Sequence, residues 1–228
     1  MKLSQRLILL FILISLIPLI AVGVFAFINF KEAMLQRTFD QLTSVRVVKT
    51  RQLESFFNDR YTDIEKFARS SEIIHLLDLL QTNEYLGHEE ELNEFKNAYL
   101  YQYFKNSGYY SELLLLTKNT SMTWSNDTSE KNLPDTLNKI LLSKPTEPGV
   151  VDFHQLSNKK IYKRLLFYTP VYNQYNRYLG LCVMTVPLDA INKIMLEKTP
   201  ESGLGESGES YLVGSDFLMR STSRFSDE

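Results

Sequence analysis

The chain is poor in residues that form covalent cross-links and metal sites. Cys182 is its only cysteine, so no disulfide can form within the chain and a small disulfide-held scaffold is excluded. Thiolate metal sites are excluded for the same reason, and His75, His88 and His154 do not have the spacing of metal ligands. The sequence therefore predicts no metal and no cofactor, and a fold that depends on its own hydrophobic core.

An excess of charge of one sign is also lacking. The 228 residues carry 25 Lys and Arg and 27 Asp and Glu, interspersed, for a net charge of −2. Nothing in this balance attracts nucleic acid, so no nucleic-acid partner is expected. Enzyme motifs are weak: the G-x-G-x-x-G spacing at 203–208 is not followed by a βαβ unit, and no motif places a nucleophile beside His154. We therefore expect that the protein is not an enzyme.

A long uncharged run, Leu7–Phe30, lies near the N-terminus. As a helix, its roughly 24 residues span about 36 Å, enough to cross a hydrocarbon core of about 30 Å. The alternative is a cleaved signal peptide, but that would have a shorter apolar region and a clear small-residue cleavage site. The run predicts an uncleaved transmembrane helix in the lipid bilayer, in which Pro18 introduces a kink without ending the helix.

The charges that flank this run predict its orientation. Lys2 and Arg6 lie in the short segment 1–6, and the positive-inside bias places that segment in the cytoplasm. Lys31 follows the run and weakens the bias. The bulk of the chain, from residue 31 onwards, is then expected outside the cytoplasm.

Glycine and proline are absent between Lys31 and Leu86. Apolar residues recur there at helical spacing, at Leu35, Phe39, Leu42, Val45, Val48, Leu53, Phe56, Ile64 and Phe67. This pattern predicts one long amphipathic helix to about Arg69, with two packed helices as the alternative. Its apolar stripe needs a partner, either a sheet or a second copy of the chain.

Further elements follow along the chain. Helical patterns occur at 70–80, 92–103, 132–141 and 187–195, and strand patterns at 112–117, 121–126, 150–153, 161–171 and 178–186. Together they predict an α+β fold, with helices packed on one face of a mostly antiparallel sheet. The glycine-rich stretch Ser202–Gly208 indicates a boundary, and two short strands are expected around a turn at Asp216.

The order of these features resembles the extracytoplasmic double Cache sensor regions of bacterial chemoreceptors and sensor kinases. The resemblance rests on the N-terminal run, the long helix, LLFYTPVYN, YLGLCVMTVPLDAINKIM and, most specifically, GLGESGESYLVGSDFLMRSTSRF. It implies a PAS-like membrane-distal module at 31–198, and a linker with the truncated start of a membrane-proximal module at 199–228. It also implies a homodimer in the bacterial inner membrane. A second span and a cytoplasmic output domain (methyl-accepting, kinase or cyclic-dinucleotide enzyme) would follow in the longer protein.

The family binds small polar molecules in its distal module, and one strand supplies candidate ligand contacts. Alternation places Tyr162, Arg164, Leu166 and Tyr168 on one face. A cation, two phenols and an apolar wall suit a ligand that carries a carboxylate. For each of these residues a role in the core or at the solvated surface is the alternative.

Three further residues complete the candidate ligand-binding set: Trp124 as a wall, Asp152 as an acceptor for an ammonium group, and Thr185. The amino-acid-sensing members of the family carry an Arg-x-Trp-Tyr cluster and a strand aspartate. This chain lacks the cluster and has Thr185 at the matching strand position, so the resemblance leaves an α-amino acid as ligand an open question.

Two hypotheses of different classes follow. In the first, the chain is a sensor in which binding of an external ligand shifts the long helix and the membrane span that continues from it. In the second, it is a single-pass anchored adaptor without a small ligand, whose helix stripe recruits protein partners.

Overall fold

The computed structural model describes most of the chain. The described residues are 3–82, 90, 94, 108–118, 123–125, 135–152, 164–197 and 202–225. They fall into two compact units: Met1–Lys49 with Lys198–Gly208, and Thr50–Glu197 with Glu209–Glu228. The helix expected at 92–103 lies outside the described residues, apart from residue 94, which is helical.

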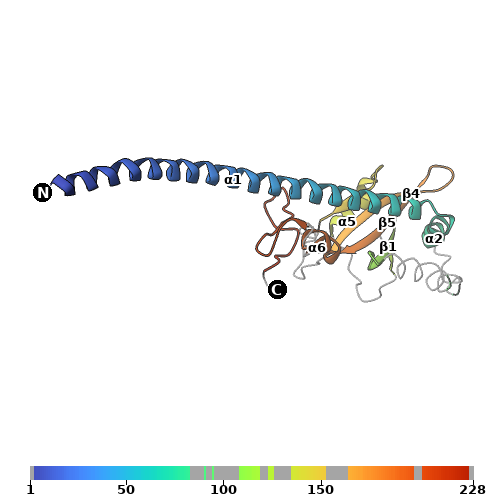
Figure 1. The fold of residues 1–228 in the computed structure, drawn as a ribbon. Coiled ribbons are helices and arrows are strands. Elements are labelled where there is room, and N and C mark those ends of the chain that lie inside the picture. The colour runs from blue at the N-terminus through green and yellow to red at the C-terminus, as the bar shows by residue number, and fades with distance from the viewer. Residues whose placement is uncertain are drawn as a thin grey trace. The chain divides into compact units, whose positions relative to one another are not determined.

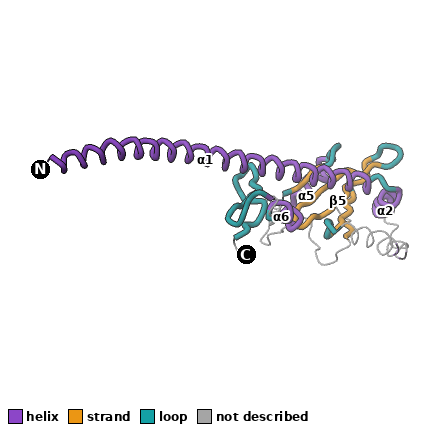
Figure 2. Tube along the Cα trace, viewed as in Figure 1, coloured by secondary structure: helices purple, strands orange, loops and turns teal. Residues whose placement is uncertain are grey.

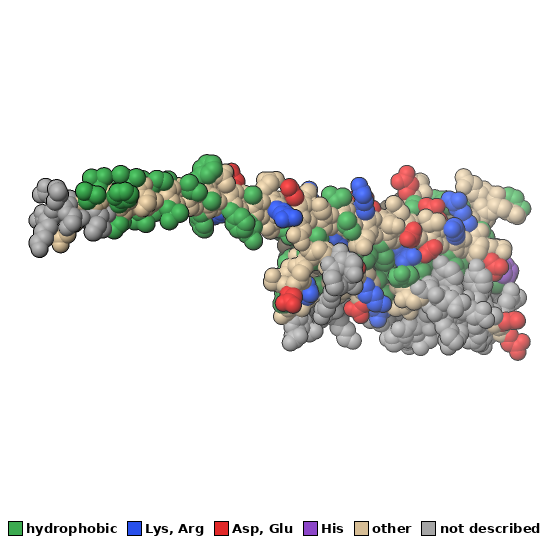
Figure 3. Space-filling model, viewed as in Figure 1, with side chains coloured by type: hydrophobic (Ala, Val, Ile, Leu, Met, Phe, Trp, Pro, Cys, Tyr) green, Lys and Arg blue, Asp and Glu red, His purple; other side chains and the backbone are tan. Residues whose placement is uncertain are grey.

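Helix α1 runs from Leu3 to Ala68 without a break and passes through Pro18. This confirms the prediction of one long helix and excludes two helices joined by a turn. At 1.5 Å per residue it is about 100 Å long. Its N-terminal part is covered by exposed hydrophobic side chains (Figure 3). An 18-residue window there has a mean hydropathy of 2.9 and is not buried at all, so α1 is long and apolar enough to cross a membrane.

The glycine-rich stretch after residue 201 forms a turn, as the sequence predicts. Gly203 and Gly205 have φ angles of 73° and 63°, a region that glycine adopts without strain. The amide of Gly208 donates to the carbonyl of Leu204 at 3.0 Å. A Cβ atom at Gly208 would lie 2.0 Å from that oxygen, so the turn requires glycine there.

Within the described residues, five antiparallel strands form one sheet, part of which is labelled in Figure 1. They are β1 (Glu112–Thr117), β2 (Thr123–Ser125), β3 (Gly149–Val151), β4 (Arg164–Tyr172) and β5 (Tyr178–Pro187). Their order across the sheet is β2-β1-β5-β4-β3, and every neighbouring pair is antiparallel. The α+β class with a long N-terminal helix is thereby confirmed.

One face of the sheet, called the α1 face, packs against the C-terminal part of α1, α2 (Ser71–Thr82) and α6 (Leu188–Met195). Phe167 of β4 is fully buried on this face. Its ring centroid lies 5.6 Å from that of Phe57 and 5.4 Å from that of Tyr61, both on α1. Aromatic contacts at this spacing add stabilisation beyond the area they bury.

The opposite face, called the α5 face, packs against α5 (Asp135–Ser143). Leu137 and Leu141 of α5 are buried against Leu116, Leu181 and Val183 of the sheet. The expectation that helices cover one face only is therefore wrong. The physical reason is that α5 has an apolar stripe of its own, and the side of the sheet that alternation turns away from α1 is also apolar.

The connection between α1 and α2 is a short serine-containing break, as predicted. The Oγ atom of Ser70 accepts a hydrogen bond from the amide of Ile73 at 3.4 Å. This satisfies one of the amides that have no partner at the start of a helix. Ser70 is thus the cap from which α2 begins, immediately after α1 ends.

Residues 209–225, called the C-terminal segment, have no helix or full strand (Figure 2). Instead of the two strands expected around Asp216, there is a single bridge between Val213 and Met219. The amide of Gly214 donates to the carbonyl of Leu218 at 2.9 Å and closes a tight turn. The two short segments on either side of this turn are bridged only to each other, and an isolated pair this short does not form a stable β-ladder.

The packing of α1 on the sheet can be tested at Phe167. We expect Phe167→Ala to lower the free energy of unfolding by about 3–5 kcal/mol, because it removes a fully buried ring and leaves a cavity. The measurement is urea unfolding of the whole chain in detergent, followed by circular dichroism. Tyr175→Ala, at an exposed position in the β4–β5 turn, is the control and should change the free energy by less than about 0.5 kcal/mol. Equal effects of the two variants would contradict this packing.

Candidate functional site

Three strands bring polar side chains together on the α5 face. In the register, Glu112 of β1 lies opposite Thr185 of β5, and Thr185 lies opposite Leu166 of β4. Arg164 begins β4 two residues earlier, on the same face as Leu166. The alternation predicted for this strand is thereby observed over its described residues.

A partly buried ion pair lies at the centre of this group. Nη1 of Arg164 is 3.4 Å from Oε2 of Glu112. The side chain of Glu112 is only 5% exposed, whereas that of Arg164 is 36% exposed. A buried carboxylate needs a partner because water no longer solvates it. Arg164 therefore neutralises Glu112 and also reaches the surface.

Thr185 connects this pair to the start of β1. Its Oγ1 atom lies 2.7 Å from Oγ of Ser111, and it donates to the carbonyl of Glu112 at 3.5 Å. Thr185 is fully buried. Buried hydroxyl groups are almost always hydrogen-bonded, and these contacts satisfy that of Thr185 within the sheet.

Tyr168 lies on the same face of β4, four residues after Arg164. It is partly buried and packs with the core on the α5 face. Its partner in the register is Gly149 of β3. A Cβ atom at Gly149 would be 2.3 Å from the Tyr168 hydroxyl oxygen, so the glycine makes room for the phenol to lie across β3. The structure thus brings Arg164, Tyr168 and Thr185 onto one face.

Of the other predicted site residues, Asp152 is the one whose side chain the structure describes, and it lies elsewhere. Asp152 follows β3 and pairs with Arg220 of the C-terminal segment rather than with the group around Glu112. Trp124 is in β2, opposite Leu115 in the register, and its side chain lies outside the described residues. Tyr162 also lies outside them. Among the described residues, no group of three or more His, Cys, Asp and Glu side chains is placed to hold a metal ion.

Sequence reasoning missed Glu112 as a member of the site. The signal was a single carboxylate at the first position of the apolar run ELLLLT. A charge that begins a buried strand needs a countercharge, and Arg164 at the start of another strand is a suitable one. Fifty-two residues separate the two, so only the antiparallel register identifies the pair.

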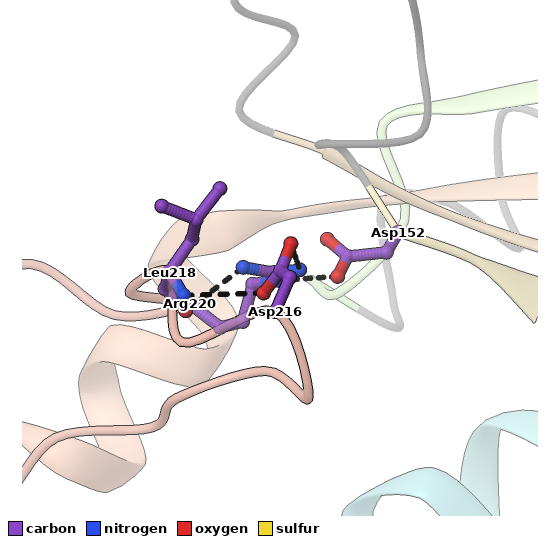
Figure 4. Close-up of polar contacts among 4 residues, drawn as sticks. All are labelled: Asp152, Asp216, Leu218 and Arg220. Atoms are coloured by element: carbon purple, nitrogen blue, oxygen red, sulfur yellow. Dashed lines mark hydrogen bonds and ion pairs between the residues drawn. The ribbon is translucent and has the colours of Figure 1, made fainter.

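Arg220 forms the second polar cluster, around Asp152 and Asp216 (Figure 4). Its Nε atom donates to Oδ2 of Asp152, and its Nη2 atom donates to Oδ2 of Asp216 at 2.8 Å. Its Nη1 atom also donates to the carbonyl of Leu218 at 2.8 Å. The Arg220 side chain is only 11% exposed. The hydrogen bond from Arg220 holds the pKa of Asp216 below its usual value, and the same bond raises the pKa of Arg220.

These contacts attach the C-terminal segment to the sheet and to α6. The amide of Thr222 donates to Oδ1 of Asn192 at 2.9 Å, and Oγ of Ser210 donates to the carbonyl of Met195 at 2.8 Å. Leu212 packs against the core on the α1 face. Asp152, which the sequence suggested as an acceptor for a ligand, therefore holds a cation from the chain itself.

Comparisons with known proteins show the fold. No family model matches the chain, and no curated protein matches it. Among solved structures, it is similar to the ligand-binding domain of the Campylobacter jejuni chemoreceptor Tlp3 in complex with 4-methylisoleucine, with a TM-score of 0.51 and 14% identity over 78% of this chain and 67% of that one. A second structure, the sensory domain of Tlp3 (CcmL), gives a TM-score of 0.48 and 15% identity over 83% and 71% of the two chains. The chain thus has the fold of a chemoreceptor ligand-binding domain.

The attachment of the C-terminal segment can be tested by a double-mutant cycle. We expect Arg220→Ala to reduce the stability of the segment by about 1–3 kcal/mol, because it removes charged hydrogen bonds and leaves Asp152 without its cation. Adding Asp152→Ala to Arg220→Ala should cost less than Asp152→Ala alone. The measurement is amide hydrogen exchange of residues 209–225. Arg177→Ala, at an exposed position, is the control, and additive effects of the two variants would rule out the pairing.

The lowered pKa of Asp216 predicts a dependence on pH. A carboxyl group whose pKa is lower in the folded chain stabilises it fully above the unfolded value of about 3.9. That contribution is lost as the pH falls through the folded pKa. We therefore expect exchange protection of residues 209–225 to fall below about pH 4, once intrinsic exchange rates are taken into account. Asp216→Asn should show a smaller fall, and an unchanged fall in this variant would contradict the assignment.

Proposed function

We propose that this chain is the membrane-anchored sensory part of a transmembrane signalling protein, and that it binds a small polar organic molecule outside the cytoplasm. One observation carries the proposal. The helix that contains a membrane-length apolar run continues unbroken to Ala68, and its C-terminal part packs on a sheet with the fold of a chemoreceptor ligand-binding domain. An anchor that is continuous with a binding domain is suited to carrying a signal.

In this proposal the module at 31–198 is a membrane-distal Cache module, and residues 199–228 are the linker and start of a membrane-proximal one. The turn at 202–208 supports a boundary there, since it lies between α6 and the C-terminal segment. The protein would reside in the bacterial inner membrane as a homodimer, with residues 1–6 in the cytoplasm. In this proposal, the longer protein would act in chemotaxis or in two-component signalling.

The ligand in this proposal carries a carboxylate that binds Arg164. A guanidinium has five N–H donors, and within the described part of the chain Arg164 makes a single ion pair, with Glu112. Its remaining donors suit a carboxylate. The Tlp3 domain was solved in complex with 4-methylisoleucine, which combines a carboxylate with an apolar body. That precedent supports a small organic acid as the ligand here.

Strand β4 provides the route by which binding would reach α1. Arg164 lies on its α5 face, and three residues later Phe167 lies on its α1 face against Phe57 and Tyr61. If β4 can occupy two positions, a ligand that binds more tightly to one of them shifts the equilibrium between them towards that position. Phe167 would pass that shift to α1, and α1 would carry it into the span.

The test is a thermal-shift screen of the whole chain in nanodiscs against small carboxylic acids, amino acids, amines and sugars. We expect at least one carboxylic acid to raise the melting temperature in a concentration-dependent way. Arg164→Met should weaken binding of that acid about tenfold or more, because a charged hydrogen bond to the carboxylate is lost.

Arg177→Ala serves as the matched control for this screen, since it removes an exposed arginine from the β4–β5 turn. It should leave binding unchanged. If no compound stabilises the chain, the sensor proposal is wrong and the anchored adaptor is favoured.

A further inference from the structure

We propose a second binding site for a small monocarboxylate, in a pocket at the end of α1 on the α1 face of the sheet. The pocket has a volume of about 390 Å³, within the range of small-molecule sites. Residues of α1, α2, the loop before β3 and the end of β4 line it, among them Glu65, Arg69, Ile74, Pro148, Thr169 and Tyr172. Figure 1 shows the end of α1, α2 and the β4–β5 turn at the same end of the sheet.

Thr169 is the first reason to expect a ligand there. It lines the pocket and is only 4% exposed. Among the described residues, Nε of Arg60 is the fully enclosed polar side-chain atom that lacks a partner, so the hydroxyl of Thr169 is open to the pocket. There it can donate to, or accept from, a hydrogen-bonding group on a bound molecule.

Arg69 is the second reason. It lines the same pocket, is 81% exposed, and has its Nη2 atom 3.5 Å from Oε2 of Glu65. An exposed ion pair at this distance contributes little to stability. A carboxylate on a ligand can therefore bind the guanidinium of Arg69, because the ion pair with Glu65 that it would replace is weak.

The pocket walls between the Thr169 hydroxyl and the Arg69 guanidinium indicate what the rest of the ligand would be. Ala68, Ile74, Pro148 and Pro170 present apolar surface. The matching molecule has a carboxylate for Arg69, an apolar body, and a hydrogen-bonding group away from the carboxylate for Thr169. A small acid of this kind fits the volume.

This site is separate from the one proposed around Arg164 and does not depend on it. Because side chains alternate along β4, Thr169 lies on the α1 face and Arg164 on the α5 face. A ligand in the pocket would contact the last turn of α1 and the end of β4 together. It would thus hold the end of the helix against the sheet, on the side where Phe167 packs.

The probe is 4-hydroxybenzoate, compared with benzoate and 4-hydroxybenzamide, added to the whole chain in nanodiscs. Saturation-transfer NMR measures binding. We expect 4-hydroxybenzoate to bind saturably and more tightly than benzoate, and the uncharged amide to bind at least tenfold more weakly. Arg69→Ala should weaken binding of both acids, because the carboxylate loses its cation.

Thr169→Val isolates the second contact. It removes the hydroxyl while keeping the shape, so we expect its melting temperature without ligand to equal or exceed that of the original chain. In this variant 4-hydroxybenzoate and benzoate should bind equally. Arg51→Ala, which removes an exposed arginine from α1, is the control and should leave binding of the probe unchanged.

Two results would overturn the proposal. One is the absence of saturable binding by either acid. The other is binding that Arg69→Ala and Thr169→Val both leave intact, because the acid would then occupy a different site. Circular dichroism of each variant verifies that a loss of binding is not a loss of fold.

Discussion

The packing of α1 on the sheet is the contact on which the rest of this structure depends. Phe167 is fully buried between β4 and the rings of Phe57 and Tyr61 on α1. Without the sheet, the apolar stripe in the C-terminal part of α1 would face water, and burial of such side chains is the main favourable term in folding. Through this contact, the C-terminal part of α1 becomes part of the folded module.

Strand β4 places functional side chains on both faces of the sheet, because successive side chains along a strand point to opposite faces. Arg164 and Tyr168 lie on the α5 face, where Arg164 neutralises the buried carboxylate of Glu112. Phe167 and Thr169 lie on the α1 face, one in the core and one in a pocket. The two proposed sites are therefore connected through a single strand, and both are linked to α1 by that strand.

Ion pairs between distant parts of the sequence hold the polar residues in place. Glu112 meets Arg164, and Asp152 meets Arg220, across 52 and 68 residues respectively. In each pair at least one side chain is largely buried, and a buried charge is strongly destabilising when its partner is removed. Such pairs restrict how the strands and the C-terminal segment can be arranged.

The sequence by itself determined the features that depend on local pattern. Hydropathy predicted the apolar part of α1, the absence of glycine and proline predicted its continuation, and alternation placed Arg164 and Tyr168 on one face of β4. Only the tertiary structure decided that α5 covers a second face, that Glu112 is the partner of Arg164, and that Asp152 binds Arg220. The physical reason is that periodicity reports which side of an element is apolar, whereas the partner of a charge depends on how the chain returns in space.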